Sequence, residues 1–122
     1  MFVLCLVIIL TATIFSLANS ESINRLEMQG IYNKNQLLLP NDGKIFHKGQ
    51  DNRIHIDFNA VKEKLINIQI EKDGILILQD RVNDLSKEVI YEINLEKYGK
   101  GSYTIAITTS LKRKITETYM VQ

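Results

Sequence analysis

The sequence has few of the residues that build specialised sites. It contains one cysteine (Cys5), one proline, two histidines and no tryptophan in 122 residues. Because no cysteine follows Cys5, the rest of the chain forms neither a disulfide nor a thiolate metal site. The 15 basic and 14 acidic residues nearly cancel. We therefore expect no attraction to nucleic acid or to an anionic membrane surface. This length fits one domain.

Charge is entirely absent from residues 1–20, which are mostly apolar. This segment ends in small residues of the kind that precede a signal-peptidase cut, namely Ser16, Ala18 and Ser20. We predict a signal peptide at 1–20 and a domain at 21–122, hence a protein exported to the periplasm, cell surface or medium. An uncleaved membrane anchor is the alternative, because the run approaches the length that spans a bilayer. No Lys or Arg precedes the run, which leaves the true start of the chain open.

Short runs of β-branched residues dominate the remainder. Fifteen of the 40 apolar residues after position 20 are isoleucine, a composition that favours strands over helices. In residues 66–70, isoleucine alternates with polar residues, as in a strand with one buried face. Asp73-Gly74 then favours a tight turn. The pattern predicts a hairpin that returns along 75–80.

Similar alternation predicts further strands at 53–58, 87–93, 103–109 and 115–121, with weaker ones at 26–32 and 36–39. Single helical turns are expected at 60–65 and 95–98. About seven strands with turn signals every eight to twelve residues are typical of a β-sandwich. The fold class is therefore all-β, an immunoglobulin- or fibronectin-like sandwich behind an N-terminal apolar signal segment.

Two local motifs extend this interpretation. Residues 68–78 form a central hairpin motif that begins I-x-I-x-x-x-G, and residues 101–107 read G-x-Y-x-I-x-I. In both motifs the chain resembles the small secreted immunoglobulin-like domains of unknown function found in Bacteroidetes, over roughly residues 26–122. The resemblance implies a sandwich behind a signal peptide and implies no activity or catalytic residues. The cysteine pair and core tryptophan of antibody domains are absent.

Tyr98 and Tyr103 flank the turn Gly99-Lys100-Gly101. This is the region where sandwich domains place a tyrosine whose hydroxyl bonds back to the connecting loop. We expect one of the two tyrosines to form such a corner.

Neither histidine belongs to a recognisable site. His47 lies in a loop-like run, whereas His55 and Asp57 share one face of a predicted strand. That spacing permits a His–Asp pair, but catalytic zinc usually takes three protein ligands. We expect His55 and Asp57 to be polar residues that face solvent.

Catalytic chemistry has no clear candidate either. The serines considered as nucleophiles lie in no G-x-S-x-G elbow: Ser86, Ser102 and Ser110. The acids considered for glycoside chemistry lie on strand faces: Asp57, Glu88 and Glu92. We predict a protein that is not an enzyme and that needs no cofactor or metal.

Two segments are candidates for partner binding. If residues 37–39 are extended, these three consecutive leucines cannot all point to one buried face, because successive side chains of a strand alternate. We therefore expect Leu38, or its neighbours Leu37 and Leu39, to face away from the core. An exposed apolar edge can pair with another chain, unless residues 21–32 cover it. Lys112, Arg113 and Lys114 are expected at the tip of the last hairpin, where three solvated charges are the simpler interpretation.

The sequence therefore predicts an exported, non-catalytic module that binds an envelope protein or a glycan. Contact with the membrane is expected only through residues 1–20, if they stay uncleaved. One alternative is a secretion or sorting sandwich. Another is a small hydrolase, which requires a pocket that joins His55 and Asp57 to a further polar side chain.

Overall fold

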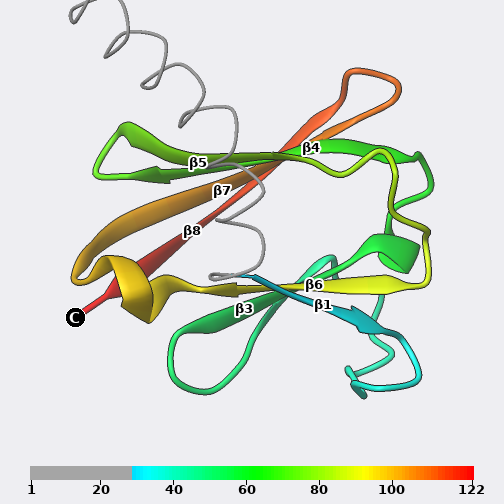
Figure 1. The fold of residues 1–122 in the computed structure, drawn as a ribbon, viewed down its shortest axis with the longest axis horizontal. Coiled ribbons are helices and arrows are strands. Elements are labelled where there is room, and N and C mark those ends of the chain that lie inside the picture. Colours follow the sequence, from blue (N-terminus) through cyan, green and yellow to red (C-terminus); the bar gives the residue numbers. More distant parts are fainter. Residues whose placement is uncertain (1–28) are drawn as a thin grey trace, which may run out of the picture.

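The computed structural model describes residues 29–122 as an all-β sandwich without α-helices. Two antiparallel sheets of four strands each are stacked face to face (Figure 1). The predicted signal segment at 1–20 lies outside the described residues. Within those residues the chain forms no helix with the length and apolarity of a membrane span.

Sheet A has the strand order β1-β6-β3-β2 and sheet B the order β5-β4-β7-β8. The strands of sheet A are β1 (Gln29–Asn33), β6 (Val89–Asn94), β3 (Arg53–Asp57) and β2 (Phe46–Lys48). Those of sheet B are β5 (Ile75–Arg81), β4 (Leu65–Lys72), β7 (Gly101–Thr109) and β8 (Lys114–Val121). Two 3₁₀ turns, η1 (Phe58–Ala60) and η2 (Leu95–Tyr98), follow β3 and β6.

The strongly alternating segments form the predicted strands. The hairpin around Asp73-Gly74 joins β4 to β5, and both turn residues have positive φ, 50° and 83°. The single helical turn expected at 95–98 is confirmed as η2, whereas the one expected at 60–65 is wrong because η1 lies earlier, at Phe58–Ala60. Asp57 caps η1 by accepting a hydrogen bond from the Asn59 backbone N–H.

Two predictions for the first part of the domain need correction. Residues 36–39 form no strand, and the short strand β2 lies in a run that the sequence indicated as a loop. The strand expected at 26–32 is seen in part as β1, since residues 26–28 lie outside the described range. Irregular segments of this kind depend on what they pack against rather than on a local period.

Facing isoleucines fill the space between the sheets. Those with no exposed surface are Ile54, Ile56, Ile68, Ile70, Ile105 and Ile107. They come from β3 in sheet A and from β4 and β7 in sheet B. Because side chains alternate along each strand, the polar neighbours of these isoleucines are directed to the outer faces.

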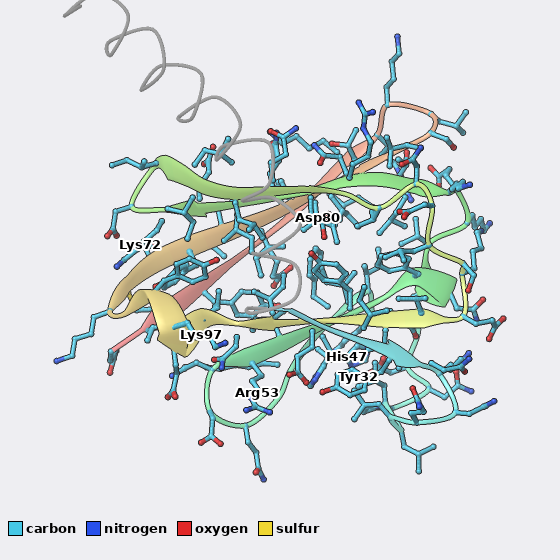
Figure 2. All side chains as sticks on the ribbon, viewed as in Figure 1. Tyr32, His47, Arg53, Lys72, Asp80 and Lys97 are labelled. Carbon is cyan, nitrogen blue, oxygen red and sulfur yellow. The ribbon has the colours of Figure 1, made fainter. Side chains whose placement is uncertain are left out.

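One charged group lies in this apolar layer. Asp80 of β5 is 8% exposed, and its Oδ2 accepts a hydrogen bond of 2.5 Å from the hydroxyl of Tyr91 on β6. Figure 2 shows Asp80 between the two sheets. The Tyr91 ring stacks on Phe58 at a centroid distance of 6.2 Å. A satisfied polar contact of this kind links the two sheets, because either group would be costly to bury alone.

The expected tyrosine corner is confirmed, and Tyr103 forms it. Its hydroxyl donates to the Gly99 carbonyl oxygen at 2.5 Å, and its side chain is fully buried. Burial, together with the negative charge of Asp73, raises the pKa of this hydroxyl, so it keeps the proton that it donates. The Lys72 ammonium lies 5.9 Å from the ring centroid and donates to the Tyr98 carbonyl. These contacts hold the loop after η2 against the start of β7.

Tyr103→Phe should remove the corner hydrogen bond without changing the packing. We expect the free energy of unfolding to fall by about 1 kcal/mol, the usual worth of one such bond. Urea unfolding followed by circular dichroism measures the change. Tyr32→Phe on the outer face of sheet A serves as the control. A loss no greater than that of the control would contradict the assignment.

The fold should also lose stability at high pH. Burial raises the pKa of Tyr98 and of Tyr119 to about 12, with smaller contributions from Tyr103 and Glu117 respectively. An unfolded tyrosine titrates near 10. The folded chain holds these protons more tightly, so the contribution is complete below pH ~10 and disappears as the pH approaches ~12. Urea unfolding at a series of pH values should show this decline, and Tyr119→Phe should make it shallower. If the free energy of unfolding of Tyr119→Phe declined with pH as steeply as that of the wild type, burial of the Tyr119 hydroxyl would not be the cause of the decline.

Candidate binding site on the outer face of sheet A

After β1 the chain crosses the outer face of sheet A before it enters β2. We call residues 34–44 the strap. Leu37 and Leu39 are half-buried, whereas Leu38 between them is 93% exposed. The prediction that Leu38 and its neighbours face opposite ways is confirmed, although the segment is a loop rather than a sheet edge.

The strap buries a residue that the strand pattern directs away from the core. Ile90 of β6 lies opposite Asp57 of β3, on the outer face, yet it is only 1% exposed. It lines a small hollow of ≈ 200 Å³ whose other walls include Leu37 and Leu39. The leucines of the strap therefore form a second, smaller apolar layer outside the sandwich.

A larger hollow of ≈ 640 Å³ lies between the strap and the β2–β3 hairpin. Its apolar wall consists of Leu37, Leu38, Leu39, Pro40 and Phe46. Its polar wall consists of Asp42, Lys44, His47, Lys48, Gly49, Gln50 and His55. Among the described residues that line it there is no serine, threonine or cysteine. These residues can therefore contact a bound group, but they offer no hydroxyl or thiol nucleophile.

His55 is a buried polar residue of this wall. It lies opposite His47 on β2 and Glu92 on β6, and it is 9% exposed. Its Nε2–H donates to Glu92 Oε2 at 2.9 Å, and the Arg53 guanidinium lies 3.7 Å from the other carboxylate oxygen. The expectation that His55 faces solvent is wrong, because the strap and its neighbours cover this face.

The predicted approach of His55 to Asp57 does not form. Asp57 turns to η1 and lines the small hollow, whereas the partner of His55 is Glu92. Sequence reasoning named Glu92 only as a strand acid. The strand register that joins the two residues links positions 37 apart in the chain, and no local pattern shows it.

His47 is anchored by the strap. Its Nε2 lies 2.9 Å from the Lys44 carbonyl oxygen and 3.8 Å from Asp42 Oδ1. The geometry identifies Nε2–H as the donor to the carbonyl. Each imidazole is thus fixed through Nε2, His47 by the strap and His55 by β6.

Gly49 leaves room beside His55. A Cβ at position 49 would lie 3.0 Å from His55 Cε1 and 3.3 Å from Nδ1, closer than ordinary contact. Within residues 29–122, His55 Nδ1 has no hydrogen-bond partner. The glycine therefore leaves an unused imidazole nitrogen beside a space in the wall of the hollow.

The other predicted partner surface lies elsewhere. Lys112, Arg113 and Lys114 occupy the tip of the β7–β8 hairpin, as expected, and all three are exposed. The Arg113 guanidinium donates a hydrogen bond of 3.0 Å to Glu63 Oε2, and its Nε lies 2.9 Å from Oε1. Figure 1 shows this hairpin on sheet B and the strap below sheet A. The structure thus does not bring the two candidate surfaces together.

The candidate serines take part in local structure. Ser86 Oγ accepts from the Glu88 backbone N–H, and the Ser102 N–H at the start of β7 donates to Asp73 in the β4–β5 turn. Ser110 lies at the exposed β7–β8 turn. Among the described residues, no three His, Cys, Asp or Glu side chains group in a way that could hold a metal ion.

Comparison with known proteins identifies no relative: no family model, no curated protein and no solved structure matches the chain. The geometry of the hollow therefore provides the basis for a functional inference.

The exposed leucine of the strap should contribute little to stability. We expect Leu38→Ser to change the free energy of unfolding by no more than ~0.5 kcal/mol, as for other surface substitutions. Ile70→Ala, in the fully buried layer, should cost about 2–5 kcal/mol. Urea unfolding of both variants gives the comparison. If Leu38→Ser were as damaging as Ile70→Ala, the leucine would belong to the core instead of a surface open to a partner.

Proposed function

We propose that this protein is an exported, non-catalytic immunoglobulin-like module that binds a protein or glycan of the cell envelope. The binding site is the hollow between the strap and the β2–β3 hairpin. The observation that carries this proposal is the apolar wall around Leu38, a large leucine kept 93% exposed next to a ≈ 640 Å³ hollow. Exposed apolar surface beside a recess with a few directed polar groups is typical of a binding site.

The strand arrangement supports the immunoglobulin-like assignment. In such sandwiches one sheet pairs strands A, B and E, and the other contains C, F and G. Here β2, β3 and β6 occupy the first set of positions, and β4, β7 and β8 the second. The tyrosine corner at the start of β7 also matches, since this strand stands in the F position.

Two strands lie outside these sets: β5, which pairs with β4 at the edge of sheet B, and β1. β1 pairs with β6, at the edge where a D strand lies in a constant-type sandwich, but it precedes the other strands in the chain. Because the first strand lies at one edge of sheet A and β2 at the other, the chain must cross the whole outer face between them. The strap, and with it the binding site, follows from this departure.

The lining of the hollow supports binding in preference to catalysis. Its walls supply two imidazoles, one carboxylate and two lysines, together with apolar side chains. The hydrolase alternative required Asp57 beside His55, and Asp57 instead caps η1. The inference of export rests on the apolar segment 1–20. An exported protein would meet its partner in the cell envelope.

Capture from the native envelope tests the proposal. The full chain in mild detergent, with an affinity tag, is crosslinked to an envelope fraction, and the retained molecules are identified by mass spectrometry and glycan analysis. We expect one partner to be enriched in stoichiometric amounts. Leu38→Asp should reduce its recovery at least tenfold, because a charge would have to be desolvated at the interface.

Leu111→Asp is the matched control. Leu111 is also highly exposed, at 75%, but it lies on the β7–β8 turn of sheet B. Recovery should survive this change. Equal loss in both variants would mean that capture follows general surface hydrophobicity, and loss only in the control would assign binding to sheet B. Either result would refute the proposed site.

A further inference from the structure

Within residues 29–122, His55 Nδ1 is a polar atom of the hollow's wall that has no hydrogen-bond partner. His55 is fixed through Nε2 by Glu92, and its Nδ1 borders the space left by Gly49. Nε2–H donates a hydrogen bond to a carboxylate. Nδ1 therefore accepts a hydrogen bond when the ring is neutral and donates a hydrogen bond when the ring is charged. A ligand atom that reaches this space would contact a nitrogen whose ring orientation is fixed by Glu92.

The charges around the recess favour an anionic ligand. Among the lining residues, Lys44 and Lys48 outnumber the single acid, Asp42. The carboxylate of Glu92 is already engaged by His55 and lies near Arg53. A ligand carboxylate at His55 Nδ1 would complete a chain in which the imidazolium lies between two carboxylates. Such charge-assisted hydrogen bonds are stronger than neutral ones.

The edge of sheet A offers a second kind of contact. Ile45 accepts from the Asp57 N–H, and the Gly49 N–H donates to Arg53, so these positions of the chain face β3. In an antiparallel pair such groups alternate along the strand, so the backbone groups of Phe46 and Lys48 are directed away from β3. Among the described residues no strand pairs with this side of β2, and both residues line the hollow.

We infer that the hollow takes an extended acidic peptide. Its main chain adds to the edge of β2, its apolar side chains contact the leucines of the strap, and one carboxylate bonds to His55 Nδ1. This inference rests on the proposed function and names the class of partner. A peptide fits better than an acidic glycan because β2 offers alternating main-chain groups. The one aromatic residue among the described lining residues, Phe46, packs against the core instead of presenting its ring to a sugar.

Selection from a phage-displayed library of short random peptides tests this inference, with the full chain in mild detergent as bait. We expect binders with an Asp or Glu flanked by β-branched or apolar residues. Replacing that acid by its amide should weaken binding about tenfold or more, measured by fluorescence anisotropy. Methylation of alternate peptide amides should abolish binding in one register and spare it in the other, as β-pairing requires.

Gly49→Ala is the decisive variant. Gly49 has no positive φ, so alanine suits the backbone, and its methyl group would fill the space beside Nδ1. It should weaken peptide binding about tenfold or more. It should lower the thermal unfolding temperature only slightly, because the His55 ring must shift by a few tenths of an ångström. Thr116→Ala, on the outer face of sheet B, is the control and should bind normally.

Four outcomes would overturn the inference. They are selection of no peptide, selection of peptides without an acid, binding unaffected by Gly49→Ala, and binding of oligogalacturonate in place of any peptide. None of these alters the envelope capture and its dependence on Leu38. The failure of this inference can therefore be distinguished from the failure of the proposed function.

Discussion

The structure depends on contact between two inner faces built largely of isoleucine. Ile54 and Ile56 on one sheet and Ile68, Ile70 and Ile105 on the other have no exposed surface. No cysteine follows Cys5, so burial at roughly 25 cal/mol per Å² holds the domain together in place of crosslinks. β-Branched side chains lose little rotamer freedom in strands. The register that buries these isoleucines also decides which polar residues share an outer face.

The outer faces of the two sheets differ in how far they are covered. On sheet B the exposed side is lined by hydroxyl residues, as in the pair Thr104 and Thr118, whose Oγ1 atoms are 3.4 Å apart. On sheet A the strap lies over the corresponding side and buries Ile90. A face that would otherwise be solvated becomes a recess with apolar and polar walls. The position of β1 beside β6, far from β2, is what forces the chain across it.

Much of the fold could be predicted from the chain, whereas little of the site could. The hairpin at Asp73-Gly74 and the corner tyrosine depend on neighbouring residues, and both were expected. The strap contains three consecutive leucines that match neither a strand nor a helix period, so a strand at 36–39 was a wrong interpretation. Leu37 and Leu39 are covered because of what lies beneath them, which is Ile90, more than fifty positions further along the chain.

His55 illustrates the same division. Alternation along 53–58 correctly directs it to the outer face, but its burial and its pairing with Glu92 come from a strand 37 positions away. The sequence by itself determined which segments are strands and which of their faces is apolar, because period-two alternation is a local property of the chain. Only the tertiary structure decided which polar residues meet and which outer face is covered, because strand order and loop path join residues through burial rather than through sequence spacing.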